Sequence, residues 1–328
     1  MGFAKIIGQQ RPVEILRSAL ANGRLHHAYL FVGPEGVGKR TVAFALAKAL
    51  HCDEAANDFC GRCAACARIQ NGNHPDVRLV DVLAGKKEIS IQQVREVERE
   101  LNFRSFSGKR KVVIIDPAPS LNLSAQNALL KTLEEPPQDS LLILIAANGG
   151  GLLPTLRSRC LRVSFGALAR DEVARYLMSQ EGISQEDARL RAALSMGSLG
   201  AALRLEEEEF LERRRSWAEK VSSLTSRNYL AASAAAEGIA SNKEEALQFL
   251  EWAETWYRDL LIHAVSANAA ETVNVDMLAH IQSQSAQREV EQLLSTFAQT
   301  ARAAGRIQRN LNRRMVLERL FFNVGGGR

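Results

Sequence analysis

The sequence predicts an α/β domain with a parallel sheet, followed by a small helical domain and a larger all-helical domain. In the first half, short apolar runs alternate with amphipathic stretches of helical period, as in parallel strands that are buried on both faces. Beyond about residue 166 these runs end, and long helical periods rich in Ala, Leu, Glu and Arg follow. A chain of 328 residues also exceeds one compact core. We therefore expect domains at residues 1–166, 167–212 and 213–328.

The expected strands are short, because each apolar run is bounded by polar residues or turn formers. They cover residues 28–32, 77–80, 112–115, 141–146 and 161–165. One clear helix lies between the third and fourth runs, where apolar positions repeat from Ala125 to Leu133 and Pro136 ends the pattern at Glu135. These elements predict a sheet with helices on both faces.

Composition limits where the protein acts. Hydrophobic residues make up 46% of the chain, but no run approaches the ~20 apolar residues of a membrane span. The first residues also lack the apolar core of a secretory signal. We therefore expect a cytoplasmic protein. The net charge of +5 is compatible with DNA contact, although such a footprint depends on clustering rather than on the total.

A glycine-rich loop follows the first strand and opens a helix. It reads Gly-Pro-Glu-Gly-Val-Gly-Lys over residues 33–39. Gly33, Gly36 and Gly38 would let backbone N–H groups approach phosphate oxygens, and Lys39 could reach the outer phosphates. The loop therefore predicts binding of ATP or ADP, with a glycine-rich turn that no longer binds nucleotide as the alternative.

The residue after the lysine departs from the full phosphate-loop motif. That motif places Ser or Thr there to hold Mg²⁺, whereas this chain has Arg40, with Thr41 one place later. A shift of one residue rotates a side chain by about 100° around a helix, so Thr41 is a poor substitute as a ligand. The loop therefore supports hydrolysis of ATP less strongly than it supports binding of a nucleotide.

The ends of the third and fourth strands supply two further nucleotide candidates. Asp116 could steer Mg²⁺, but the next position, where a water-activating glutamate is expected, holds Pro117. Asn148 could sense the terminal phosphate. The alternatives are that Asp116 caps the following loop and that Asn148 forms a turn.

Four cysteines form a cluster at about residues 52–66. They are Cys52, Cys60, Cys63 and Cys66. Four thiolates can complete a tetrahedral Zn²⁺ site, and nothing supplies an open coordination position, so the cluster predicts a structural zinc module rather than disulfides. His51 and His74 flank the cluster, and we expect them at the surface rather than as ligands.

An arginine motif lies between the fourth and fifth strands. Residues 155–160 read Thr-Leu-Arg-Ser-Arg-Cys. An arginine at the edge of a nucleotide-binding domain can reach the γ-phosphate held by a neighbour; a surface salt bridge is the alternative. Cys160 is expected to be a buried free thiol.

Taken together, these motifs resemble the bacterial DNA polymerase III clamp-loader subunits of the AAA+ class, most closely the delta-prime subunits. The most specific stretches are residues 27–31, the four cysteines, residues 127–137 and the Ser-Arg-Cys of residues 158–160. The resemblance implies an arc of subunits with the gamma/tau ATPase subunits and the delta subunit, which loads the sliding clamp onto primed DNA. It also implies that residues 167–212 form a lid, that residues 213–328 form a collar and that Arg159 acts in trans on a neighbour's ATP.

Three departures from the ATPase members favour a largely non-hydrolysing subunit. Arg40 replaces the magnesium hydroxyl, Pro117 replaces the glutamate, and Gly200 stands where the ATPase subunits have a sensing arginine. The alternative is an active AAA+ ATPase, either a gamma/tau-like motor or a separate DNA-remodelling enzyme, in which Lys39 and Asp116 suffice together with Thr41. The chain would be an accessory subunit of a polymerase holoenzyme, since no pair of carboxylates is placed as a two-metal polymerase site.

The C-terminal region combines an apolar stripe with a basic surface. Between Ile307 and Phe322 apolar residues recur at helical spacing, which suits ordinary core or a collar contact. Nearby arginines make the region basic. They are Arg302, Arg306, Arg309, Arg313 and Arg314. Without interleaved aromatic residues, they indicate a solvated or intersubunit face more than a DNA contact.

Overall fold

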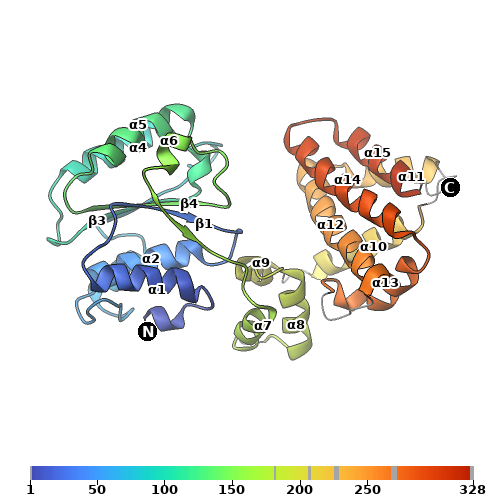
Figure 1. The fold of residues 1–328 in the computed structure, drawn as a ribbon, viewed down its shortest axis with the longest axis horizontal. Coiled ribbons are helices and arrows are strands. Elements are labelled where there is room, and N and C mark those ends of the chain that lie inside the picture. Colours follow the sequence, from blue (N-terminus) through green and yellow to red (C-terminus); the bar gives the residue numbers. More distant parts are fainter. Residues whose placement is uncertain (1, 181, 206–207, 225–228, 267–271, 326–328) are drawn as a thin grey trace. The chain divides into compact units, whose positions relative to one another are not determined.

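The computed structural model describes residues 2–180, 182–205, 208–224, 229–266 and 272–325. The chain divides into two compact units (Figure 1). The first contains Met1–Gln180 with Gly197–Ala201, and the second contains Glu181–Met196 with Ala202–Arg328. The three-domain division stays a prediction.

The first unit is built on a five-stranded sheet in which all neighbouring strands are parallel. Its order is β2-β3-β4-β1-β5. The strands are β1 (Ala28–Val32), β2 (Val77–Val80), β3 (Lys111–Ile115), β4 (Ser140–Ala146) and β5 (Leu161–Ser164). Every residue of β1 and β4 is buried, as expected for central parallel strands. The five predicted strands are confirmed, with bounds that differ by at most one residue.

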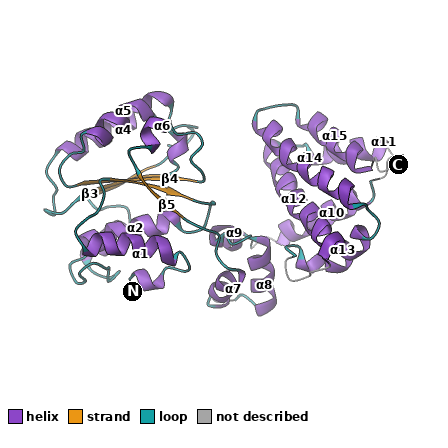
Figure 2. Cartoon of the chain, viewed as in Figure 1, coloured by secondary structure: helices purple, strands orange, loops and turns teal. Residues whose placement is uncertain are grey.

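Helices cover both faces of this sheet (Figure 2). Successive strand side chains point to opposite faces, so Tyr29 and Phe31 pack in one core and Leu30 in the other. On the Tyr29 face lie α1 (Gln10–Ala21) and α2 (Lys39–His51), with α3 (Ala64–Gln70) against α2. On the Leu30 face lie α4 (Ile91–Asn102), α5 (Leu123–Glu134) and α6 (Pro154–Arg157). This arrangement confirms the predicted α/β class.

Local signals set the bounds of α5, the helix that was predicted from its period. Asn122 caps its first turn by accepting a hydrogen bond from the Ala125 N–H at 2.9 Å. The helix ends at Glu134, two residues before Pro136. Gln126 is buried, and its amide contacts the Gly151 carbonyl and the Leu153 N–H. The helix thereby fixes the loop that leads to the arginine motif.

The remaining elements are helical. They are α7 (Arg170–Met178), α8 (Gln185–Leu194), α9 (Leu199–Arg204), α10 (Glu208–Ser222), α11 (Tyr229–Ile239), α12 (Lys243–Ser266), α13 (Leu278–Ser285), α14 (Val290–Gln308) and α15 (Arg313–Gly325), with 3₁₀ turns at Phe3–Lys5, Ala118–Ser120 and Val275–Met277. In the second unit, α12 packs on α14 around an aromatic core that includes Trp217, Phe249 and Trp256.

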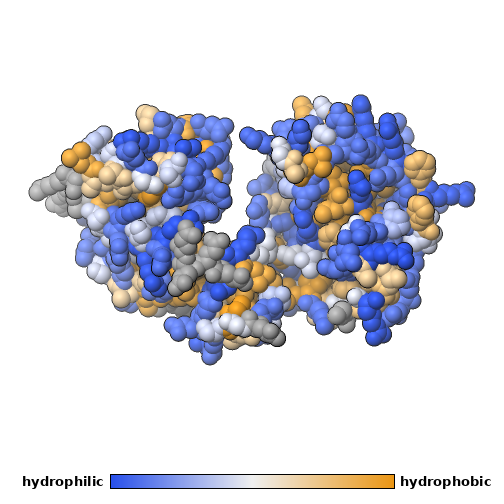
Figure 3. Space-filling view, turned by 180° about the vertical axis from the view of Figure 1, so that it is seen from behind, coloured by the Kyte–Doolittle hydropathy of each residue, from blue (hydrophilic) through white to orange (hydrophobic). Residues whose placement is uncertain are grey.

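Hydrophilic side chains cover most of the face shown in Figure 3. Among the described residues, no helix is both long and apolar enough to cross a membrane.

The expected apolar stripe from Ile307 to Phe322 is not one continuous helix. Asn310 has a left-handed φ of 63° and separates α14 from α15. Leu311 and Met315 are 49% and 67% exposed, whereas Ile307 and Phe321 are buried. The stripe is therefore divided between two helices that pack on each other.

Candidate functional site

The glycine loop lies between β1 and α2, as the sequence predicts. Gly36 and Gly38 have φ values of +70° and +101°, a region that costs other residues strain. A Cβ on Gly33 would lie 2.3 Å from the backbone oxygen of Phe165. The loop geometry therefore depends on glycine at these positions, and α2 begins directly after it at Lys39.

Lys39 bonds through its ammonium group to carbonyl groups of the loop itself. Its side chain is buried, and Nζ donates to the carbonyls of Gly33 and Pro34, each at 2.5 Å. Burial lowers the pKa of Lys39, while the charges of Asp116 and Glu35 act in the opposite direction. The ammonium has three donors, so one remains for another acceptor.

Arg40 points to two carboxylates at the ends of neighbouring strands. Its Nε donates to Asp116 Oδ2 at 2.5 Å, and its Nη2 donates to Asp81 Oδ2 at 2.8 Å. Burial alone would lower the pKa of Arg40, but the hydrogen bonds to Asp116 and Asp81 raise it overall. A guanidinium therefore neutralises the carboxylate that was expected to steer Mg²⁺.

Sequence reasoning missed Asp81. It follows β2 as Asp116 follows β3, and these strands are neighbours in the sheet. The carboxyl ends of neighbouring parallel strands meet at one edge, which brings both carboxylates to Arg40. The available signal was the repeated pattern of an apolar run ending in aspartate.

The other predicted nucleotide residues, Thr41 and Asn148, are exposed and take no part in the hydrogen bonds that Arg40 forms with Asp116 and Asp81. Thr41 is exposed on the first turn of α2. Pro117 follows Asp116 through a cis peptide bond. Asn148 is exposed, and its side-chain oxygen accepts a hydrogen bond from the Gly150 N–H at 2.8 Å. The side chain of Asn148 therefore closes its own turn.

The segment around Gly200 lies directly against the glycine loop. The Gly200 N–H donates to the Gly36 carbonyl at 2.9 Å. A Cβ on Gly200 would lie 3.0 Å from the Cα of Gly36, and one on Gly36 would lie 2.3 Å from Ser198 Oγ. This backbone leaves little room for an arginine at position 200. Gln9, which sequence reasoning missed, also holds the loop by donating to the Val37 carbonyl at 3.1 Å.

The four predicted cysteines come together. Their sulfur atoms all lie within 4.8 Å of one another, a set that could hold one metal ion. Cys52 directly follows α2, and Cys63 directly precedes α3. The Cys63 N–H points at Cys60 Sγ at 3.2 Å. Burial raises the pKa of the Cys66 thiol to about 12. Burial also acts to raise the pKa of the Cys63 thiol, but hydrogen bonds with the backbone of Asp53 and Cys66 outweigh it and lower this pKa to about 7.

The expected surface position of His51 and His74 is wrong. Both are buried, and their ring centroids lie 4.4 Å apart. Together with Asp76 they place ligand atoms within 4.8 Å of one another. However, His74 Nδ1 accepts the Asp76 N–H at 3.2 Å, so a neutral ring carries its proton on Nε2 and offers no free lone pair. Asp76, which directly precedes β2, accepts hydrogen bonds from the N–H groups of Phe106 and Ser107, each at 2.9 Å. It therefore ties the loop between α4 and β3 to the edge of the sheet.

Arg159 makes an ion pair within its own chain. Its Nη2 lies 2.6 Å from Glu134 Oε1 at the end of α5, and its Nη1 donates to the Thr155 carbonyl at 2.8 Å. The side chain is 36% exposed. A guanidinium has five N–H donors, so donors remain for a further anion. The adjacent Cys160 is buried as predicted, and burial raises the pKa of its thiol to about 12.

Comparisons with known proteins agree over both units. The family model described as DNA polymerase III, delta subunit, matches residues 8–169, and the one described as DNA polymerase III, delta subunit, C terminal, matches residues 208–324. The chain is 35% identical over 267 residues to DNA polymerase III subunit delta' of Escherichia coli (strain K12), covering 80% of this chain and 78% of that protein.

Two other relatives match over shorter stretches of the sequence, and one solved structure aligns with most of the chain. The chain is 39% identical to subunit delta' of Pseudomonas aeruginosa, covering 64% of this chain and 65% of the relative. It is 35% identical to subunit tau/gamma of Haemophilus influenzae, covering 63% of this chain but only 30% of that protein. A solved DNA polymerase III, gamma subunit-related protein of Thermotoga maritima covers 96% of this chain, with 18% identity and a TM-score of 0.44.

Proposed function

The chain belongs to the family of DNA polymerase III delta and delta' subunits, and from this premise we propose that it is a largely non-hydrolysing subunit of a clamp loader. The observation that carries the proposal is the contact of Arg40 with Asp116 and Asp81. Mg²⁺ binds carboxylates through their negative charge and oxygen lone pairs, and here the Arg40 guanidinium hydrogen-bonds to Asp116 Oδ2 and neutralises that carboxylate. Pro117 adds no group that could activate water.

We propose that Arg159 serves the ATP site of a neighbouring ATPase subunit. An arginine supplied in trans stabilises charge that develops on the transferred phosphoryl group, and is worth about 10³–10⁵ in rate. The contacts with Glu134 and Thr155 hold the guanidinium at the surface and leave donors for a phosphate. Glu134 would then orient Arg159 before the subunits meet.

The cysteine cluster would hold a structural Zn²⁺. Four thiolates fill a tetrahedral shell, so no coordination position is left for substrate or water. The metal would join the end of α2 to the start of α3, because Cys52 and Cys63 flank these helices. Its role is therefore to stabilise the module rather than to act in catalysis.

The proposed partners are those of the family: gamma/tau ATPase subunits, the delta subunit, the sliding clamp and primed DNA. Residues 167–212 would act as the lid and residues 213–328 as the collar. The loop from Gly33 to Lys39 keeps the backbone of a phosphate cradle, so binding of ATP or ADP, with Mg²⁺ accompanying the nucleotide, remains part of the proposal. As a subunit, the chain would support a polymerase holoenzyme without a polymerase site of its own.

The test is ATP turnover, stimulated by clamp and primed DNA, in an assembly reconstituted with the partner subunits. We expect Arg159→Ala to lower turnover strongly, while Arg157→Ala, in the same motif, and Lys39→Ala change it by less than about twofold. A strong loss with Lys39→Ala instead would support the second candidate, an active AAA+ motor. That candidate is favoured by the intact glycine loop and Lys39.

A further inference from the structure

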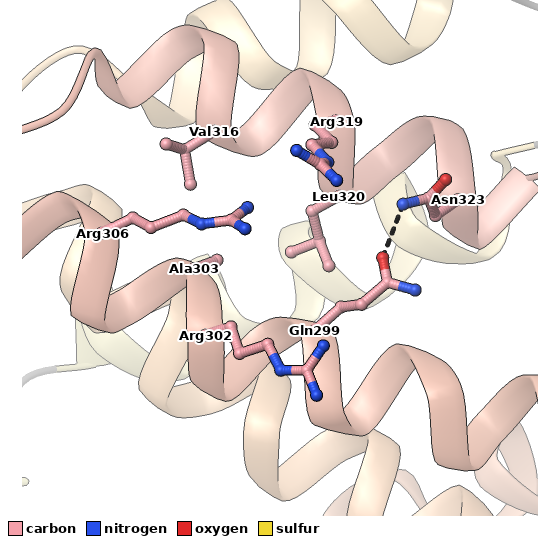
Figure 4. Close-up of a pocket in the computed structure, with 8 residues that line it drawn as sticks. All are labelled: Gln299, Arg302, Ala303, Arg306, Val316, Arg319, Leu320 and Asn323. Carbon is pink, nitrogen blue, oxygen red and sulfur yellow. Dashed lines mark hydrogen bonds between the residues drawn. The ribbon is translucent and has the colours of Figure 1, made fainter.

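A concave pocket of about 180 Å³ lies between α14 and α15 (Figure 4). Three arginines line it. Arg302 and Arg306 are one turn apart on α14, and Arg319 comes from the facing helix α15. The lining residues include no Asp or Glu. Like charges one turn apart on a helix repel each other, so the charges of Arg302 and Arg306 do not themselves stabilise α14.

These arginines differ from their basic neighbours. Arg314 pairs with Glu318 at 3.0 Å and with Glu237 at 3.2 Å. Arg313 donates to the Ala240 carbonyl at 3.2 Å. By contrast, no described carboxylate forms an ion pair with the three arginines of the pocket. Arg306 and Arg319 therefore extend from facing helices into one concave site, while Arg302 lies at its edge beside Gln299 (Figure 4), and no ion pair with a carboxylate of the described residues balances their charge.

The pocket also has an apolar floor, and a hydrogen bond between its two helices lies at one end. Ala303, Val316 and Leu320 line it and are buried. At one end Asn323 Nδ2 donates to Gln299 Oε1 at 2.6 Å, which ties α15 to α14 (Figure 4). The site therefore combines strong positive charge with an apolar surface, within a groove whose two walls are joined.

We propose that this pocket receives a carboxylate side chain, flanked by an apolar residue, from another subunit of the assembly. The inference rests on the proposed function, which places the helical unit among partner subunits. Guanidinium groups bind carboxylates through paired, charge-assisted hydrogen bonds, and arginine is enriched at protein interfaces. The apolar floor gives the flanking residue a place to bury surface.

Nucleic acid fits this pocket less well. A DNA backbone presents a row of phosphates and is contacted by cations spread along it, whereas Arg306 and Arg319 extend from facing helices into one small pocket (Figure 4). Single-stranded DNA is also held by stacking on aromatic side chains, and none lines the pocket. A carboxylate beside an apolar residue of a partner protein is complementary to the positive charge of the pocket and to its apolar floor.

The experiment compares association of the full chain with its partner subunits in the variants Arg306→Glu/Arg319→Glu and Arg306→Gln/Arg319→Gln. The matched control is Arg215→Glu/Arg309→Glu, which reverses two exposed arginines outside the pocket. Sedimentation gives the affinity at low and high salt, and circular dichroism gives the melting temperature of each variant. We expect at least about a tenfold loss for the Glu pair, a smaller loss for the Gln pair and less than about twofold for the control.

Two results would overturn the inference. In the first, the pocket variants remain folded and associate as tightly as the control. In the second, assembly is unchanged while DNA affinity alone falls, which would assign the pocket to nucleic acid. Failure of the wild-type chain to associate with clamp-loader partners would instead contradict the proposed function, so the two failures are distinguishable.

Discussion

Replacing Arg40 with serine tests whether its guanidinium blocks magnesium. The variant loses ion pairs with Asp81 and Asp116, at 2.8 and 2.5 Å. The Arg40 side chain is 45% exposed, so solvent screens both pairs, and we assign each about 0.5–1 kcal/mol. The expected loss is about 1–2 kcal/mol, or roughly 2–8 °C in the melting temperature of a domain of this size.

Magnesium should reverse this loss in the variant alone. Without Arg40, Asp81 and Asp116 lose the cation to which both are bonded, and the new hydroxyl stands where the phosphate-loop motif places a magnesium ligand. We expect Mg²⁺ with ATP to raise the melting temperature of Arg40→Ser, and the affinity for nucleotide to rise at least about tenfold over the value in EDTA, a gain of about 1.4 kcal/mol.

The assays are thermal unfolding and titration with a fluorescent nucleotide, each with Mg²⁺ or EDTA. Arg104→Ser is the matched control, because Arg104 is exposed and bonds neither carboxylate. If wild type and Arg40→Ser respond equally to Mg²⁺, the guanidinium is not what excludes the ion. The proposal for a non-hydrolysing site would then lose its main support.

Three further predictions concern other parts of the first unit. Glu134→Gln removes the partner of Arg159 and should lower turnover of the reconstituted assembly by less than Arg159→Ala does, because orientation is lost but the cation stays; equal losses would contradict a purely orienting role. Cys66→Ser should reduce bound zinc from one ion per chain and lower the melting temperature, whereas Cys160→Ser, at a buried thiol outside the cluster, should leave the zinc content unchanged in a colorimetric release assay. Burial alone would raise the pKa of Asp76, but hydrogen bonds from Ser107 and Phe106 hold it below its ordinary 3.8. The stability that this carboxylate contributes is therefore complete above that value and lost as the pH falls through the lower, folded-state pKa. Urea unfolding should show Asp76→Asn less stable than wild type by about 1–3 kcal/mol at pH 7, with a smaller difference at pH 3; an equal difference at both pH values would refute this assignment.

Local sequence determined the five strands of the first unit and its most clearly marked helix, α5. The strands of a parallel sheet are buried on both faces, so each needs a continuous apolar run, and the five runs gave bounds within one residue. The start of α5 at Asn122 and its end before Pro136 are likewise local, because capping and the steric effect of proline act over a few residues. The cysteine spacing was also sufficient to predict that the four sulfur atoms lie together, since Cys60, Cys63 and Cys66 are close in sequence and lie at the start of α3 or just before it.

Tertiary structure alone decided which distant side chains meet. Asp81 reaches Arg40 because β2 lies beside β3, and strand order does not follow from the composition of either strand. Glu134 meets Arg159 because α5 and α6 pack on the same face of the sheet. The burial of His51 and His74 depends in the same way on a loop that Asp76 holds in place. Local propensity and period act over a few residues, whereas these contacts depend on how the whole sheet is ordered and covered.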